Sequence, residues 1–152
     1  MTTDTSERGL ERLICTALAG DACEPSREHG VRRPMPGYGG VGWIPGDWQD
    51  YDREHCLDLA QLSAFLRDTQ PEGCDALELA QDGPTRRKFL ARLQGEIRRR
   101  GTIDVLRHGI KHGPHHLDLF YGTPSAGNAR AAERNAANRF SVTWRWGAGV
   151  MA

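Results

Sequence analysis

Lysine is scarce in this chain of 152 residues, where only Lys88 and Lys111 occur. Neither lysine lies two residues after an acid, so the sequence contains no Glu-x-Lys. Metal-dependent nucleases hold Mg²⁺ with carboxylates and commonly use a lysine to orient the attacking water. Glu96-Ile-Arg98 has a similar spacing, but arginine cannot exchange a proton as lysine does. The given sequence therefore lacks the Glu-x-Lys that a metal-dependent nuclease centre of this kind needs.

Other absences exclude further classes of protein. No window approaches about 18 consecutive apolar residues, so no membrane span is expected. The N-terminal MTTDTSERGLERLI has no basic leader followed by an apolar block, so no secretory signal is expected. Cys15, Cys23, Cys56 and Cys74 show no C-x-x-C spacing. Without a signal, we expect four reduced thiols and a cytoplasmic protein.

Signatures of common catalytic and metal sites are missing too. There is no G-x-S-x-G elbow, and no Cys is placed with a His in a recognisable local signature of a catalytic pair. The GYGG run at 37–40 lacks the Gly-Lys-Ser/Thr that phosphate loops need, which favours a structural loop. His115 and His116 are adjacent in an expected strand and so point to opposite faces. With His108 and His112 they are therefore expected to be polar hairpin residues, and no metal site is predicted.

The net charge of zero hides an asymmetry between the two halves. Residues 1–82 carry 16 acids and 7 bases, and residues 83–152 carry 4 acids and 13 bases. A basic half of this kind can meet phosphates, or it can simply attract the acidic half. Both interpretations stay open at this point.

The first fifty residues divide into a helix and a loop. Apolar residues at helical spacing predict a helix within 1–20, with Thr5 or Ser6 as its cap and Gly20 as its stop. The stripe expected to face the core consists of Leu10, Leu13, Ile14, Ala17 and Leu18. Residues 21–50, rich in proline and glycine, are predicted to form a long loop.

Residues 51–109 are predicted to be mainly helical. One helix runs from Cys56 and ends before Gln70-Pro71, and a short helical piece follows from Pro71. A third helix is expected from a Thr85 cap to Gly101. Its apolar face consists of Phe89, Leu90, Leu93 and Ile97. A turn is expected through residues 102–109.

Residues 110–146 are predicted to contain the strands. Strands at 110–112 and 115–121 meet at Gly113-Pro114, an Ala-rich helix covers 128–138, and apolar residues alternate through 139–146. The expected fold is therefore α/β in the broad α+β sense, with helices flanking an incomplete sheet of about three strands. Residues 1–152 are expected to form a single incomplete domain. The last strand would leave an apolar edge unpaired, which predicts poor solubility or dimerisation.

Basic residues gather on the third predicted helix, 85–100. Lys88, Arg92 and Arg99 project from one side, with Arg87 and Arg98 nearby. The residues expected to contact DNA are Lys88, Arg92, Arg98, Arg99 and Arg100. A charged helix face of this kind is either only solvated or contacts the DNA backbone.

Four stretches in order carry a resemblance to a known family. They are ERLICTALAG, GYGGVGWIPGDWQDYDREHCLDLAQLSAFLRDTQPE, RKFLARLQGEIRRRGTIDVLRHGIKHGPHHLDLFYGTPSAGN and NRFSVT. Over about positions 7–143 the chain resembles the N-terminal region of the R subunit of type I restriction enzymes. That resemblance implies a PD-(D/E)xK-type nuclease fold and a cytoplasmic, ATP-driven motor. It also implies Mg²⁺ and ATP as cofactors of the family, and DNA and the modification and specificity subunits as partners.

The resemblance also has implications for catalysis. A Glu on the first helix often stands near the active centre of this fold, and Glu11 matches that position, with Glu7 as the alternative register. The family's catalytic Asp and Glu-x-Lys follow the strand that NRFSVT resembles, whereas here that strand runs into WRWGAGVMA. We therefore expect a truncated R-subunit fragment that binds no cofactor and has no nuclease or ATPase activity by itself. The alternative is a non-enzymatic module that binds DNA or docks onto a restriction complex through helix 85–100.

Overall fold

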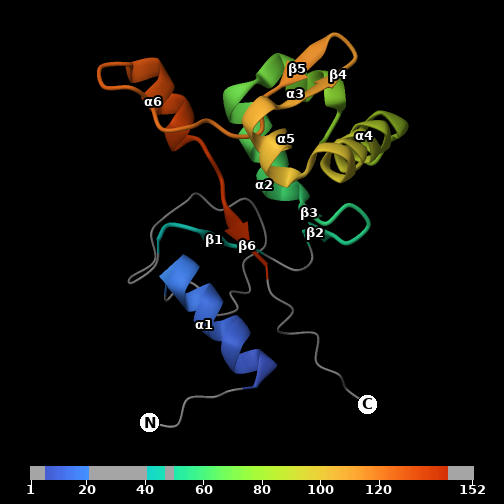
Figure 1. Cartoon of the computed structure of the whole chain (residues 1–152). Helices are drawn as coiled ribbons and strands as arrows, with labels where there is room; N and C mark the ends of the chain where they lie inside the picture. Colours follow the sequence, from blue (N-terminus) through green and yellow to red (C-terminus); the bar gives the residue numbers. More distant parts are fainter. Residues whose placement is uncertain (1–5, 21–40, 47–49, 144–152) are drawn as a thin grey trace. The chain divides into compact units, whose positions relative to one another are not determined.

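The computed structural model describes residues 6–20, 41–46 and 50–143 of the chain. They belong to two compact units: unit 1 comprises Met1–Gln61 and Arg139–Ala152, and unit 2 comprises Leu62–Asn138. Both contain helices and very short strands (Figure 1). The predicted α+β class is therefore confirmed at this level, while the expectation of one domain stays a prediction.

The described residues contain six helices and six strands. The helices are α1 Glu7–Ala19, α2 Leu59–Thr69, α3 Pro71–Leu77, α4 Pro84–Arg100, α5 Thr102–His108 and α6 Ala129–Ala136. The strands are β1 Ile44–Pro45, β2 Tyr51–Asp52, β3 Leu57–Asp58, β4 Ile110–His112, β5 His115–Leu117 and β6 Ser141–Val142.

The strands of the described segments form three two-stranded sheets, not one sheet of about three strands. β4 pairs with β5 in the predicted hairpin, but the second strand ends at Leu117 and does not extend to residue 121. β2 pairs antiparallel with β3, inside the segment predicted to be mainly helical. β6 pairs parallel with β1, and Ile44 N–H donates to the Phe140 carbonyl at 2.8 Å. The predicted single sheet is thus wrong, because the last strand finds its partner in the segment expected to be a loop. The expectation that the last strand lacks a partner is also wrong, because β6 pairs with β1 along one edge. Trp144 and Trp146 lie outside the described residues.

Helix α1 begins and ends as predicted but buries a different face. Ser6 Oγ accepts a hydrogen bond from Gly9 N–H at 3.2 Å, and Gly20 closes the helix with φ 69°. Cys15 and Ala19 form its buried side, against which Val142 packs. The predicted stripe lies outward, with exposed fractions of 58% for Leu10, 56% for Leu13 and 49% for Ile14. The small side chains face the strands because β1 and β6 lie close to the helix.

Helix α4 anchors unit 2. Phe89, Leu90 and Leu93 are buried as predicted, and Gly101 ends the helix with φ 85°. The expected Thr85 cap is wrong: Gly83 is the N-cap, with no side-chain cap hydrogen bond, and the helix begins at Pro84. Proline suits this first position because its missing N–H has no helical partner there.

Two short elements complete the packing around α4. Residues 102–108 form α5, not the predicted turn, and their buried anchor is Val105. The hairpin buries Ile110 and Leu117, which are paired across the two strands. Gly109 has φ +61°, and a Cβ there would come within 2.3 Å of the Leu117 carbonyl oxygen. Glycine is therefore required where α5 turns into β4.

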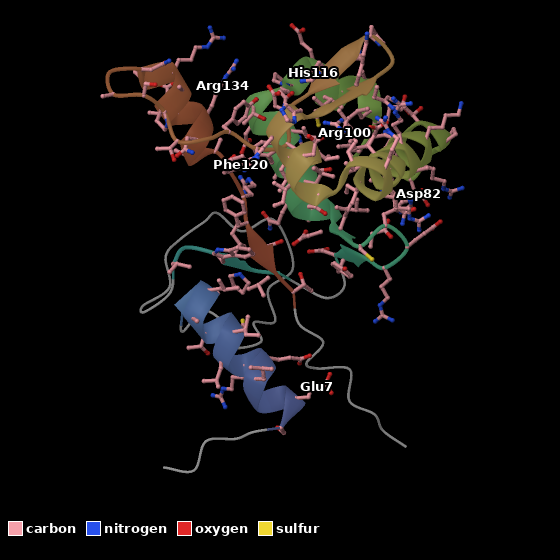
Figure 2. The ribbon with its side chains drawn as sticks, in the orientation of Figure 1. Glu7, Asp82, Arg100, His116, Phe120 and Arg134 are labelled. Carbon is pink, nitrogen blue, oxygen red and sulfur yellow. The ribbon has the colours of Figure 1, made fainter. Side chains whose placement is uncertain are left out.

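The Ala-rich helix α6 confirms the prediction for 128–138. Asn128 Oδ1 accepts from Ala131 N–H at 3.0 Å and so caps the helix start. Asn135 and Asn138 both donate to the Tyr121 carbonyl, at 2.8 and 2.7 Å. The Arg134 guanidinium lies over the Tyr121 ring at 5.4 Å, and Figure 2 labels Arg134 on this helix.

The cysteines differ from expectation at one position. Cys15 is disulfide-bonded, so the prediction of four reduced thiols is wrong there. Cys56 is free and exposed, Cys74 is free and buried, and Cys23 lies outside the described residues. Burial raises the pKa of the Cys74 thiol. Among the described residues, no helix combines the length and hydropathy needed to cross a membrane.

Candidate nucleic-acid interface

The solvent side of α4 carries most of the predicted DNA-binding residues. Lys88, Arg92, Arg98 and Arg99 are all exposed. The opposite side holds Phe89, Leu90 and Leu93, which fix the helix to the core of unit 2. The amphipathic spacing of α4 therefore presents four cations to solvent. We call these four cationic residues the basic face.

Glu96 organises two members of the basic face. Its carboxylate pairs with Arg99 at 2.6 Å and with Arg92 at 3.5 Å, and only 11% of its side chain is exposed. Hydrogen bonding from Arg99 lowers the pKa of Glu96, with Arg100 and Arg92 adding to the effect. The arginines themselves stay accessible, because 54% of the Arg92 side chain and 69% of the Arg99 side chain are exposed.

Arg100 has a different role from the other predicted DNA-binding residues. Its Nε donates to the Asp104 carboxylate, and its Nη1 donates to the Gly109 carbonyl at 3.2 Å. Only 23% of its side chain is exposed. Arg100, labelled in Figure 2, thus connects the end of α4 to both ends of α5. The Asp104 hydrogen bond raises the pKa of Arg100, and the same bond lowers the pKa of Asp104.

Charge at the start of α4 is partly compensated by one acid. Asp82 pairs with Arg86 at 3.0 Å and with Arg87 at 3.1 Å. The hydrogen bond from Arg87 lowers the pKa of the Asp82 carboxyl. Figure 2 labels Asp82 beside this end of the helix. Asp82 therefore offsets one of the two arginine charges at this end of the helix.

Lys88 and Arg98 are the members of the basic face with the greatest freedom. Neither forms an ion pair with any residue in the described ranges. Both are exposed and lie on either side of Ala91 and Gly95. A long cationic side chain that has no internal counter-ion can meet an external anion without breaking an existing contact.

Glu11 and Glu7, the acids that the sequence resemblance suggests for catalysis, lie in unit 1. Glu11 is half-buried on α1, and Glu7 is exposed in the first turn, where Figure 2 labels it at the helix start. A negative side chain there is favourable for the helix dipole, which is sufficient reason for Glu7. Across the residues that the structure describes, no three His, Cys, Asp or Glu side chains converge to hold a metal ion.

The clustered histidines have separate local partners. His108 Nδ1 lies 2.9 Å from an Asp104 carboxylate oxygen, and His116 Nε2 lies 3.4 Å from Asp118 Oδ1. The His112 ring stands edge-on to Phe89, with centroids 5.6 Å apart. Each of these three histidines thus has a neighbour in contact. His112 and His116 lie in the hairpin as predicted, whereas His108 ends helix α5. The GYGG run at 37–40 lies outside the described residues.

Sequence reasoning missed the acids that hold the basic residues. Glu96, Asp82 and Asp104 decide which arginines are available, yet none was singled out as a counter-ion. Each forms a pair at i,i+4 spacing, with Arg92, Arg86 and Arg100 respectively. That spacing is visible in the sequence and is a known source of helical ion pairs.

Comparisons of this chain with protein-family models, with curated proteins and with solved structures find no match.

Proposed function

We propose that this chain is a region of the type I restriction R-subunit kind that contacts the phosphate backbone of duplex DNA through the basic face of α4. The supporting observation is the exposure of Lys88, Arg92, Arg98 and Arg99 on one helix that is fixed to a core. The proposal combines both hypotheses drawn from the sequence: descent from a DNA-cleaving complex, and DNA contact by the basic helix.

Glu96 does not cancel the basic face. One carboxylate stands against two exposed arginines, and Lys88 and Arg98 add two further charges. A guanidinium carries five N–H donors, so an arginine held by one carboxylate keeps others for a phosphate. Holding Arg92 and Arg99 in place also reduces the side-chain entropy lost on binding.

Part of the proposal concerns chemistry. The sequence has no Glu-x-Lys, so we propose that these residues alone do not cleave DNA and that Glu11 lacks the partners it would need. The restriction-endonuclease-like fold, and docking to modification and specificity subunits, are proposed on the resemblance alone. Incubating the purified chain with supercoiled plasmid and Mg²⁺ tests the first statement, and Mg²⁺-dependent nicking that vanishes in Glu11→Gln contradicts it.

A salt titration tests DNA contact. Fluorescence anisotropy of a labelled duplex is measured against protein at several salt concentrations. Four phosphate contacts predict a slope of about −3 to −4 in log K against log salt, because each contact contributes about −0.9. The double variant Lys88→Gln/Arg98→Gln is expected to lose about 2 of that slope.

The matched control removes two exposed cations away from α4. Arg53 precedes β3 and Arg130 lies on α6, and both are exposed. Arg53→Gln/Arg130→Gln lowers the total charge equally, so equal losses in the two double variants would indicate non-specific attraction by net charge. A flat salt response in the unmodified chain would rule out DNA binding through phosphates.

The cytoplasmic location is also part of the proposal, and the Cys15 disulfide weighs against it. Disulfides are rare in reducing compartments. Alkylation of free thiols immediately after cell lysis, followed by mass measurement, decides the matter: a fully alkylated Cys15 supports the cytoplasm.

A further inference from the structure

Gly95 lies at the centre of the basic face. Neighbours on a helix surface are three and four residues apart, which makes Ala91, Arg92, Arg98 and Arg99 the neighbours of Gly95. Three of the four positions around this glycine are thus exposed arginines. The fourth is alanine, so the helix backbone is bare along one line between the cationic side chains.

Nothing in the fold requires a glycine at this position. A Cβ built on Gly95 would meet no atom within 4 Å. Its backbone is helical and its φ is not positive. The other glycine inside a helix of unit 2 is explained by packing, because a Cβ on Gly73 of α3 would come within 2.8 Å of Leu117 Cδ2.

Glycine inside an exposed helix also has a cost. It loses more conformational freedom on folding than alanine and lowers helix stability. α4 keeps this glycine shortly before the turn that carries three consecutive arginines, Arg98, Arg99 and Arg100. A destabilising residue that packing does not explain, surrounded by three arginines, has a ready explanation if another backbone comes close to it.

We propose that Gly95 is the point of closest approach between α4 and a DNA strand, with one phosphodiester resting against the bare helix surface inside the triangle of Arg92, Arg98 and Arg99. The inference rests on the proposed DNA contact and adds where the strand lies. Arg92 and Arg99, held from below by Glu96, approach the phosphate from one side. Arg98 approaches from the other.

Substitutions of Gly95 test this inference, because they separate stability from binding. In Gly95→Ala, the melting temperature is expected to rise by about 1 to 4 °C. Its affinity for a labelled duplex is expected to fall about two- to fivefold, since the added methyl keeps the phosphate away from the backbone. Gly95→Leu is expected to weaken binding about tenfold or more, with the salt slope reduced by about 1.

The matched control is Ala132→Leu, which adds a large apolar side chain at an exposed position of α6. Its affinity for the same duplex is expected to equal that of the unmodified chain. If Gly95→Ala and Gly95→Leu both bind with unchanged affinity while Lys88→Gln/Arg98→Gln is weakened, the strand does not cross Gly95. The inference is then overturned and the proposed function stands. If the unmodified chain shows no salt-dependent binding, both fail together.

Discussion

Helices α1 and α4 are both amphipathic, yet they use their apolar faces in opposite ways. In α4 the apolar positions are in the core, and Phe89 has an exposed fraction of 0%. In α1 the apolar positions Leu10 and Leu13 are more than half exposed, and the buried side chains are Cys15 and Ala19. Both helices lie close to where the sequence predicts, but only one buries the face that its periodicity predicts.

The difference follows from what each helix packs against. α4 packs against α5, α3 and the β4–β5 hairpin, whose residues Val105, Ile110 and Leu117 are apolar and buried. α1 packs against β1 and β6, each two residues long. So small a sheet provides little apolar area, and small side chains let the helix approach it closely. Periodicity therefore shows which face could be buried, and the partner decides which face is.

The largest expected effect comes from replacing one apolar residue in each helix by alanine. Phe89→Ala is expected to lower the free energy of unfolding by about 3 to 5 kcal/mol, because it leaves a cavity in a packed core. Leu13→Ala is expected to cost less than about 1 kcal/mol, since more than half of that side chain is already in water. Urea unfolding followed by circular dichroism measures both. Equal losses would show that the apolar face of α1 is covered in solution.

A second test concerns the helix starts. Ser6→Ala removes the hydroxyl that caps α1 and is expected to cost about 1 kcal/mol. Thr85→Ala is expected to change the free energy of unfolding by less than about 0.5 kcal/mol, because Gly83, not Thr85, is the N-cap of α4. Thermal melts of the two variants, followed by circular dichroism, compare these values. A larger loss in Thr85→Ala would contradict the cap observed at Gly83.

The smallest expected effect is the pH dependence of stability that arises from the acids paired with arginines on and beside α4 and α5. The pKa of Glu96 is lowered from 4.5, chiefly by Arg99, and the pKa values of Asp82 and Asp104 are lowered from 3.8 by their arginines. A carboxyl group whose pKa is lower in the folded than in the unfolded state stabilises the protein at any pH above its unfolded-state pKa. That contribution is lost as the pH falls through the folded-state pKa. Stability is thus expected to be level near neutral pH and to decline below about pH 4.

Glu96→Gln checks the assignment of that decline. The amide cannot ionise, so the variant is expected to show a shallower loss of melting temperature between about pH 5 and pH 3. An unchanged acid profile would mean that the Glu96 cluster contributes nothing to it, as is common for exposed ion pairs.

The predictable and unpredictable parts of the fold differ in length and in the range of their contacts. α4 was predictable because Phe89, Leu90 and Leu93 repeat at helical spacing and Gly101 ends the run. α5 was missed because its seven residues contain one buried side chain, Val105, which produces no periodic signal. The β1–β6 pair was missed because two-residue strands carry no alternation, and their pairing depends on residues far apart in the chain.

The candidate interface shows the same limit. Lys88, Arg92, Arg98 and Arg99 could be placed on one exposed surface from spacing alone. Arg100 could not be separated from them, because its partners Asp104 and the Gly109 carbonyl become neighbours only when α5 folds back beside α4 (Figure 1). The exposed helix face is thus predictable from the sequence. The pairing of Arg100 with residues of α5 and with Gly109 is not, because it depends on the tertiary fold.

The pairing of Ile44 with Ser141 sets an order of events during synthesis. Unit 2 is one uninterrupted segment, so it can fold on the ribosome as soon as it has emerged. Unit 1 contains β1 from early in the chain and β6 from late in it, and must wait with its small core open until residue 142 is available. Cys15 and Ala19 therefore lack the Val142 contact until then, and helix α1 is expected to reach its final packing later than unit 2.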